Sequence, residues 1–417
     1  MTVDQVFAMP VPLADGLLLR EARPGDGEQI RALLTERGDA HDALDHRLVS
    51  EDPDAGWSGC AVVVDGGRVV STASLLDEEV RISGVRLPAG QVELVATDAE
   101  YEGRGLVRAL MQWAHARSAA RGHLLQVMIG IPYFYRQFGY EYAVDIPTPL
   151  ALHTVPDGVG AAALRTARAA DLPALAALQE EAQRGFDLAM PHSPACWRWL
   201  LAHDASTLRV VERAGRVVAS ARTTPVDDGE FLLAEAAATD RAAALHLLGA
   251  VAGSAPEARL HVVHRPGTVP AEAWHDLLKH APREEAEQYY LRIPDPAALL
   301  DRLRPLLRRR LEAAGIDRAG RDLLLSTYRA HYRIPVEPEG LGDVVTGGTL
   351  QRPGAVEGTA GGVAVAPDQL PGLLFGPLGV EGLARLRPDV YTAGGEEELY
   401  RALFPPLTAD LLTFYLP

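Results

Sequence analysis

The fold is decided by the stretch Val92-Glu-Leu-Val-Ala-Thr-Asp-Ala-Glu-Tyr-Glu-Gly-Arg-Gly-Leu-Val-Arg-Ala-Leu-Met111. Its first residues are apolar and β-branched and predict a buried strand. An amphipathic helix follows, with one apolar face formed by Leu106, Ala109, Leu110 and Trp113. Gly122 stands where such a helix would end. The stretch therefore predicts a strand, a glycine-bearing turn and a helix in direct succession.

The turn Gly103-Arg104-Gly105 is a candidate anion site. Unpaired backbone N–H groups and the positive end of the helix dipole meet at the first turn of a helix, and glycine has no Cβ to keep phosphate oxygens away. The spacing is neither that of a P-loop nor the G-x-G-x-x-G of dinucleotide folds. A tight turn without any ligand is the alternative interpretation, because turns also use glycine for steric reasons.

Two elements in this region carry a resemblance to a known family. Val95-Ala-Thr-x-x-x-Tyr-Glu-Gly-Arg-Gly-Leu resembles the coenzyme A-binding segment of the GNAT N-acetyltransferases, although Glu102 stands where Arg or Gln is typical and Val107 where a small residue is typical. Downstream, Tyr133-Phe-Tyr-Arg-Gln-Phe-Gly-Tyr140 resembles the second conserved element of that family. The resemblance implies a GNAT fold of the α/β (α+β) class.

The same resemblance implies a set of site residues. Acetyl-CoA would be the co-substrate, bound by backbone groups of the strand and turn and by the far side of the channel: Val95, Ala96, Thr97, Gly103, Arg104, Gly105, Leu106, Val107, Arg108, Gly130 and Ile131. Tyr135 matches the family tyrosine that protonates the leaving thiolate. The carboxylate of Pro417 would be the base, by resemblance to Eis-like enzymes, with Glu93 as the alternative.

An internal repeat predicts the domain organisation. Leu19-Arg-Glu-Ala-Arg-Pro-Gly-Asp26 recurs as Leu164-Arg-Thr-Ala-Arg-Ala-Ala-Asp171, and Gly67-Arg-Val-Val70 recurs as Gly215-Arg-Val-Val218 at nearly the same offset. Each copy should begin with a strand and a helix with an acidic N-cap, followed by a hairpin. The second copy has no glycine before its helix at Ala236-Ala-Ala-Thr-Asp-Arg-Ala-Ala-Ala-Leu245, so we expect it to have lost the coenzyme site.

Three domains are therefore expected. Residues 1–150 would form the catalytic GNAT domain, residues 160–293 a degenerate second GNAT-like domain, and residues 294–417 a small α/β domain similar to sterol carrier proteins. This layout resembles the enhanced intracellular survival (Eis) family, whose members form hexamers, so a homo-oligomer is expected. The arginines of Asp301-Arg-Leu-Arg-Pro-Leu-Leu-Arg-Arg-Arg-Leu311 would form a solvated helix face, or else a patch for an acidic partner.

Composition limits the partners. The net charge of -16 and pI near 5.3 argue against nucleic acid and favour a cationic small molecule, although acidity can also serve solubility alone. Cys60 and Cys196 have no metal-ligand spacing, so no metal site is expected and both should be reduced, buried thiols. The sequence contains neither an apolar run long enough for a membrane span nor a basic signal-peptide start, and a cytoplasmic protein is expected.

The leading hypothesis is an acyltransferase that moves an acetyl group from acetyl-CoA to a primary amine, of a cationic small molecule or a lysine-like group, by direct transfer in a ternary complex. One alternative is a tandem-GNAT enzyme that takes an aminoacyl group from tRNA, which the acidic composition disfavours. Another is a non-catalytic acyl-CoA sensor or scaffold. The identity of the acceptor amine and the acyl chain length are left open by the sequence.

Overall fold

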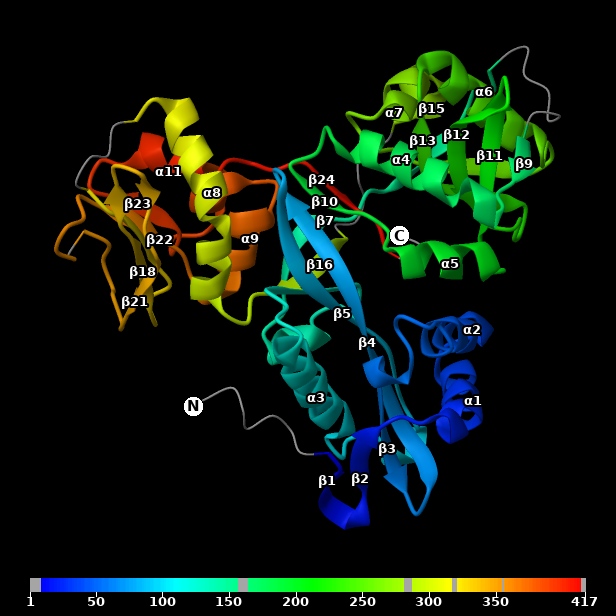
Figure 1. The fold of residues 1–417 in the computed structure, drawn as a ribbon, viewed down its shortest axis with the longest axis horizontal. Coiled ribbons are helices and arrows are strands. Elements are labelled where there is room, and N and C mark those ends of the chain that lie inside the picture. The colour runs from blue at the N-terminus through cyan, green and yellow to red at the C-terminus, as the bar shows by residue number, and fades with distance from the viewer. Residues whose placement is uncertain (1–8, 157–163, 281–286, 317–320, 355, 414–417) are drawn as a thin grey trace.

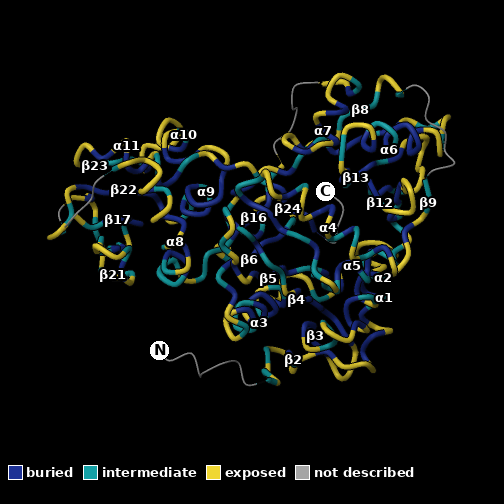
Figure 2. The backbone as a smooth tube through the Cα atoms, turned by 45° about the horizontal axis from the view of Figure 1, so that its top comes forward, coloured by how far each residue is buried: buried dark blue, intermediate teal, exposed yellow. Residues whose placement is uncertain are grey.

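The structure is a computed structural model that describes residues 9–156, 164–280, 287–316, 321–354 and 356–413. Three lobes meet in the middle of the molecule (Figure 1). Each lobe has its own sheet and helices, and buried backbone runs through the centre of each lobe while exposed residues lie on its outside (Figure 2). The predicted mixed α/β class with two tandem domains and a third α/β domain is confirmed.

The first sheet has ten strands, eight of which form one continuous path. Their order is β1 (Val11–Pro12), β2 (Leu18–Glu21), β3 (Cys60–Asp65), β4 (Arg68–Ile82), β5 (Val85–Thr97), β6 (Leu125–Met128), β16 (Gln288–Arg292) and β7 (Glu141–Asp145). The helices of this domain are α1 (Gly27–Arg37), α2 (Ala40–Ser50) and α3 (Leu106–Ala120). The predicted helix is α3, which buries Leu106, Leu110 and Trp113 against the sheet.

The second sheet repeats this arrangement. Its order is β15 (Leu278–Lys279), β8 (Pro149–Leu152), β14 (Arg259–Val263), β13 (Glu230–Ala238), β12 (Arg216–Thr223), β11 (Thr207–Arg213) and β9 (Leu164–Thr166). Its helices are α4 (Leu172–Gln183), α5 (Pro194–Ala202), α6 (Arg241–Gly253) and α7 (Val269–Trp274). The predicted hairpins are present in both copies, as β3–β4 and β11–β12.

Both copies also share one polar network at the start of the first helix. Arg20 binds Asp26 through two hydrogen bonds of 2.6 and 2.8 Å, and the backbone N–H of Arg23 donates to the same carboxylate. Arg165 and Asp171 repeat these contacts in the second copy. The acidic residues stand at the predicted N-cap positions, but their carboxylates bind this arginine and the preceding turn instead of capping the helix. The repeated network supports a duplicated unit.

The two domains exchange one strand each. β8 follows the first domain in sequence but lies between β14 and β15 of the second sheet. β16 follows the second domain but lies between β6 and β7 of the first sheet, antiparallel to both. The predicted boundaries near residues 150 and 293 did not include this exchange, because a strand of apolar and aromatic residues can complete either of two similar sheets.

The third domain packs on the first through a single apolar core. Its sheet has the order β21 (Val345–Gly347), β18 (His331–Ile334), β17 (Leu323–Ser326), β22 (Gly362–Ala364) and β23 (Tyr391–Ala393). A separate hairpin pairs β19 (Val336–Glu337) with β20 (Gly340–Leu341). The helices are α8 (Pro296–Ala314), α9 (Leu370–Phe375), α10 (Gly379–Leu386) and α11 (Glu397–Leu403).

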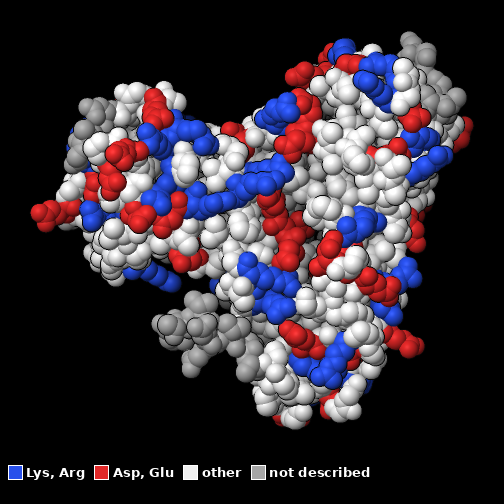
Figure 3. Space-filling view, in the orientation of Figure 1, with Lys and Arg blue, Asp and Glu red and all other residues white. Residues whose placement is uncertain are grey.

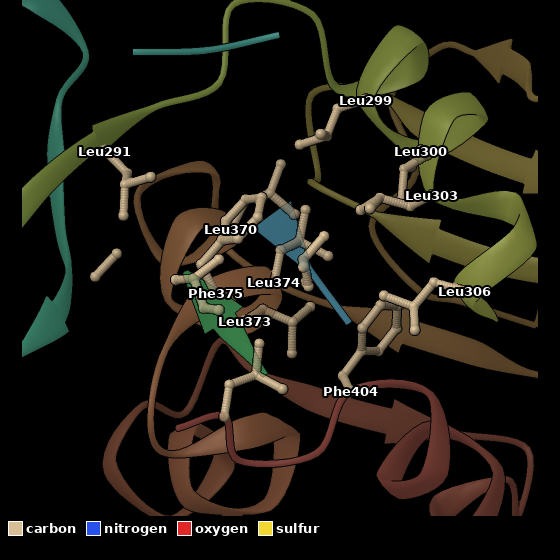
Figure 4. Close-up of a cluster of buried hydrophobic side chains, with 14 of the residues drawn as sticks. Leu291, Leu299, Leu300, Leu303, Leu306, Leu370, Leu373, Leu374, Phe375 and Phe404 are labelled. Atoms are coloured by element: carbon tan, nitrogen blue, oxygen red, sulfur yellow. The ribbon is translucent and has the colours of Figure 1, made fainter. Parts of the chain in front are cut away.

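Figure 4 shows the contact between these elements: leucines of α8 face α9, with Leu291 of β16 alongside. Leu299, Leu300 and Leu303 of α8 are almost fully buried. Each such side chain contributes roughly 1.5–3 kcal/mol of burial free energy, so the apolar face of α8 joins the third domain firmly to the first.

The arginines of α8 lie on its other face, where Figure 3 shows basic side chains over the helix. Several donate to backbone carbonyls of neighbouring segments: Arg302 to Arg86 (3.0 Å), Arg309 to Ser83 (2.7 Å) and Arg310 to Leu403 (2.7 Å). These arginines therefore do more than solvate a helix face, because they also tie α8 to the β4–β5 turn and to the end of α11.

The described chain ends between the first two domains. β24 (Ala409–Leu411) pairs in parallel with β10 (Leu188–Met190), which in turn pairs with the end of β4. Asp410 of β24 forms a buried ion pair with Arg265 of the second domain. Gln183 of α4 donates to the same carboxylate at 3.0 Å. This strand therefore joins all three domains.

Replacing Asp410 by Asn should lower the free energy of unfolding by about 3–5 kcal/mol, because the buried Arg265 would lose the carboxylate that balances its charge. Urea denaturation followed by circular dichroism measures the change. Glu230→Gln is the matched control: it removes one partner of an exposed ion pair with Arg259 and should cost under about 1 kcal/mol. Equal effects of the two substitutions would contradict the structural role of β24.

Candidate active site

The centre of the candidate site is a bulge in β5. Thr72 of β4 faces Ala96, but Ser74 faces Glu93, so β5 has one residue more than β4 over this interval. Leu94 lies in the bulge and has a φ of 53°. This left-handed conformation costs a residue that has a Cβ roughly 1–2 kcal/mol. Bulges of this kind often re-aim the backbone next to active sites.

Beyond the bulge, β5 separates from its other neighbour. The parallel pairing of β5 with β6 covers only residues 89–91 and 125–127. The continuation of β5 as far as Thr97 therefore turns its backbone away from the β6 ladder. β5 is thus splayed from β6 at this end, which leaves room for a ligand to lie against the backbone of β5.

Helix α3 begins beside this opening. Gly105 is its N-cap, with a φ of 77° and no side chain capping the helix, and Gly103 also has a positive φ of 73°. A Cβ at either position would meet nothing within 4 Å, so it is the backbone conformation, and not the space, that requires glycine here. The first N–H groups of α3 remain available to an anion.

These elements line a pocket of about 630 Å³, within the size range of small-molecule sites. Ten of the predicted residues line it: Val95, Ala96, Thr97, Gly103, Gly105, Leu106, Val107, Arg108, Ile131 and Tyr135. It is further lined by Arg37, Tyr101, Glu102, Phe134, Gln137 and Phe138. The structure thus brings together the strand, turn and aromatic element that the sequence placed apart.

Two of the predicted coenzyme-binding residues do not line the pocket. The Arg104 guanidinium lies over the Tyr101 ring, 4.6 Å from its centroid, and donates to the carbonyl oxygen of Glu100 at 3.1 Å. Gly130 lies under the Tyr135 ring, where a Cβ would come within 2.5 Å of a ring carbon. Gly130 therefore serves the packing of Tyr135, and only the backbone of Arg104 is near the anion site.

Tyr135 is buried among other aromatic rings. Its side chain is 7% exposed, and it packs edge-on against Phe134 and Tyr290. Burial, together with the charge of Glu93, raises the pKa of Tyr135 to about 12. The two other tyrosines of this element are placed differently: Tyr140 is fully buried and donates to Gln126 at 3.1 Å, whereas Tyr133 is 74% exposed.

The sequence did not indicate a tyrosine pair that holds the far wall of the pocket. Tyr290 of β16 stacks on Tyr142 of β7, with the two phenol oxygens 2.6 Å apart. The Tyr290 hydroxyl donates to the carbonyl oxygen of Ile131 (3.2 Å), and the Tyr142 oxygen accepts the backbone N–H of Tyr133 (2.8 Å). Because β16 comes from a distant part of the chain, no local pattern could have predicted this contact.

Carboxylates gather on the other side of β5. Glu93 is half-buried, and burial followed by the charges of Asp45, Asp42 and Glu78 raises its pKa to about 8, although Gln91 donates to it at 2.6 Å. Burial and the charge of Asp77 raise the pKa of Glu78 to about 8 as well. Figure 3 shows acidic side chains gathered in the middle of the molecule, where the lobes meet.

The predicted base Pro417 lies outside the described residues. The chain that leads to it can be followed as far as Thr413. The Tyr289 hydroxyl of β16 donates to the carbonyl oxygen of Leu411 at 3.1 Å, and Arg222 donates to that of Thr413 at 3.2 Å. Within the described residues, Leu411 therefore lies against β16, the strand that also contacts Tyr135.

The equivalent region of the second domain is filled by its own side chains. Asp240 caps α6 by accepting the N–H of Ala243 at 2.8 Å, so a carboxylate stands where the first domain leaves the N–H groups available. Arg265 donates to the carbonyl oxygen of Ala234 at 3.1 Å, in the part of β13 that lies beyond its pairing with β14. A small cavity of about 30 Å³ beside Arg265 is lined by residues of α4, β12 and β13, and by none of α6.

Cys196 has a histidine partner that the sequence did not suggest. Its Sγ lies 3.2 Å from Nδ1 of His192, whose Nε2 contacts Glu235 at 2.9 Å. The thiol is 1% exposed, and burial raises its pKa well above the ordinary value. A thiol without solvent access or thiolate character is a poor nucleophile, so this trio is a structural contact.

Among the described residues, no group of three or more His, Cys, Asp or Glu side chains is arranged to hold a metal ion. Within the same residues, none of the helices combines the length and apolar character needed to span a bilayer.

The raised pKa values of Glu78 and Glu93 predict how stability depends on pH. Between about pH 4.5 and 8 the folded protein keeps protons that the unfolded chain has lost, so these two groups make the protein less stable as pH rises. Glu93→Gln should therefore raise the melting temperature, relative to the unchanged protein, more at pH 8.5 than at pH 5. Differential scanning fluorimetry across this range measures the difference.

Glu79→Gln is the control, with the same change of charge at a carboxylate that pairs with Arg81 and Arg86. If Glu93→Gln shifts the melting temperature equally at both pH values, the raised pKa of Glu93 is wrong.

Comparison with known proteins agrees with this geometry. Residues 28–143 match the family model of the acetyltransferase (GNAT) domain. No curated protein sequence matches the chain. A probable N-acyltransferase of unknown function from Enterococcus faecalis is similar in structure, with 14% identity and a TM-score of 0.66 over 95% of this chain and 99% of that chain.

Two further structures extend the comparison. Eis1 from Mycobacterium abscessus has 15% identity and a TM-score of 0.60 over 96% of this chain and 100% of that chain. Saccharomyces cerevisiae N-myristoyltransferase with bound myristoyl-CoA has 13% identity and a TM-score of 0.50 over 70% of this chain and 86% of that chain. The chain thus contains a GNAT acetyltransferase domain, has the fold of these proteins, including Eis1 over nearly its whole length, and is an acyltransferase.

Proposed function

We propose that the protein transfers an acetyl group from acetyl-CoA to a primary amine of a cationic small molecule or lysine-like group, by direct transfer in a ternary complex. The observation that carries the proposal is the pocket in which the splayed end of β5, the uncapped start of α3 and the buried Tyr135 meet. A GNAT acetyltransferase domain over residues 28–143 and a yeast structural neighbour solved with an acyl-CoA support the choice of donor.

In this proposal acetyl-CoA lies along the pocket, with its pyrophosphate at the start of α3 and its thioester beside the end of β5. The N–H groups at Gly103 to Arg108 bind its pyrophosphate, because a helix N-terminus attracts anions. The backbone of Val95 to Thr97 donates to the thioester oxygen as negative charge develops on it. Ile131 covers the opposite side.

Transfer needs one acid and one base. The amine nitrogen attacks the thioester carbon, the carbon–sulfur bond breaks, and the departing thiolate takes a proton. Tyr135 can supply that proton because a pKa of about 12 keeps the phenol protonated at neutral pH. The amine loses a proton to a base, since an ordinary amine with a pKa near 10.4 is largely protonated at pH 7.

Two groups are candidates for the base. Glu93 lies on β5 itself, and a pKa of about 8 is close to the best value for a base that works near neutral pH. The carboxylate of Pro417 is the alternative from the family resemblance, supported by the anchoring of β24 beside β16. If Glu93 is the base, activity should rise with pH up to about 8, because only the deprotonated carboxylate can accept a proton from the amine.

The acceptor is proposed to be cationic because carboxylates gather around Glu93 on β5. Asp42 and Asp45 of α2 act on Glu93, and Glu78 adds a further carboxylate. These groups attract an ammonium group, and the net charge of -16 attracts cations over a longer range. The same charge disfavours tRNA as a donor. Assembly into a hexamer, as in the Eis family, remains part of the proposal.

Thiol release from acetyl-CoA across a panel of polyamines, aminoglycosides and peptides tests the proposal. We expect release that depends on an amine, and Tyr135→Phe should lower kcat by about 100-fold or more, because the leaving thiolate loses its proton donor. The Kd for acetyl-CoA should stay within about twofold, since the phenol oxygen acts only during transfer.

Tyr391→Phe is the matched control, because it removes a hydroxyl of the third domain that donates to the carbonyl oxygen of Gln351. It should keep full activity. Absence of thiol release with every amine, despite coenzyme binding, would favour the sensor alternative. Full turnover of Tyr135→Phe would remove Tyr135 from the mechanism.

The two candidate bases make different predictions. If Glu93 is the base, Glu93→Gln should lower kcat by about 100-fold and remove the rise of activity between pH 6.5 and 8. If the carboxylate of Pro417 is the base, deletion of residues 414–417 should lower kcat by about 100-fold and Glu93→Gln should not. Measuring pH profiles of kcat for both variants separates the two, and two unchanged profiles would exclude both groups.

A further inference from the structure

Glu102 introduces an unfavourable charge at the mouth of the pocket. It directly precedes Gly103, lines the pocket, and has a side chain that is 56% exposed. The resemblance places Arg or Gln at this position, and a carboxylate beside a phosphate-binding turn repels a phosphate. The chain therefore needs a compensating cation if this turn binds an anion.

Arg37 is that cation. It is the last residue of α1, far from the turn in sequence, and its Nη2 forms an ion pair with Oε1 of Glu102. Its side chain is 36% exposed and lines the same pocket. A guanidinium has five N–H donors, and the contact with Glu102 uses one of them, so others remain for a ligand.

The charged residues lining the pocket are Arg37, Glu102 and Arg108. Their net charge is therefore plus one, and it would be zero without Arg37. Arg108 is already engaged with Gln137 at 2.9 Å and lies over the Phe138 ring. Arg104, which is nearer in sequence, is turned onto Tyr101. Arg37 is thus the cation of this lining that contacts the residue directly before the turn.

We propose that Arg37 is a phosphate-binding residue for the coenzyme, held in place by Glu102. The inference rests on the proposed function and adds a residue that neither the motif nor the family pattern contains. In this arrangement the acid at position 102 orients the guanidinium, and the guanidinium supplies the positive charge that the turn lacks. A planar guanidinium suits this role because it can bind a carboxylate and a phosphate oxygen together.

Isothermal titration calorimetry on the full chain tests the proposal with two probes. Acetyl-CoA carries the phosphates, and acetyl-pantetheine carries the same thioester without them. Arg37→Ala should raise the Kd for acetyl-CoA at least tenfold and leave that for acetyl-pantetheine within about twofold. Equal weakening for both probes, or no weakening for acetyl-CoA, would overturn the role of Arg37.

A double substitution separates phosphate binding from simple neutralisation of Glu102. If Arg37 only cancels the charge of Glu102, then Arg37→Ala combined with Glu102→Gln should bind acetyl-CoA like the unchanged protein. If Arg37 contacts phosphate, the double variant should remain at least fivefold weaker. Recovery of full affinity would therefore also overturn the proposal.

Arg86→Ala is the matched control, because it removes an exposed arginine of the same domain that pairs with Glu79. It should leave both Kd values unchanged. Melting curves of each variant verify folding, and Arg37→Gln provides a second substitution of similar length with the same expected loss. If the unchanged protein binds neither probe, the proposed function fails first; if it binds acetyl-CoA and Arg37→Ala binds equally well, only this inference fails.

Discussion

The first domain depends on the insertion of β16 between β6 and β7. Without this strand the two neighbours would have no ladder to join them, and the far wall of the pocket would lose its support. Tyr290 on one face of β16 holds the carbonyl of Ile131 and packs against Tyr135, while Tyr289 on the other face binds the carbonyl of Leu411. One short strand thus links the proposed acid, the coenzyme wall and the end of the third domain.

Local features of the site could be predicted from the sequence, and its non-local features could not. The glycines before α3 need positive φ, and the periodicity of α3 is regular, so residues 92–111 predict their own structure. The Arg37 contact with Glu102 and the Tyr290 contact with Ile131 join segments that no spacing rule relates. Likewise, the raised pKa of Glu93 depends on α2 and β4, which approach β5 only after folding.

The two copies show how the same supersecondary unit can hold a ligand or replace it. In the first, a glycine N-cap leaves the start of α3 without an internal anion. In the second, Asp240 supplies that anion and Arg265 supplies a donor to the separated part of β13. A carboxylate at a helix N-terminus is stabilising, so the second copy has gained local stability in exchange for an accessible site. The first copy keeps backbone N–H groups without a capping side chain at the start of α3.

Reciprocal exchange of β8 and β16 also determines when each domain can be completed during synthesis. β6 and β7 are translated well before β16, and at about 5–20 residues per second the delay is roughly 7–30 seconds. During that time the nascent first sheet has two unpaired strand edges, which are prone to pair with other chains. Products of premature termination within the second domain would keep these edges, so they should be substrates for chaperones and proteases instead of independent enzymes.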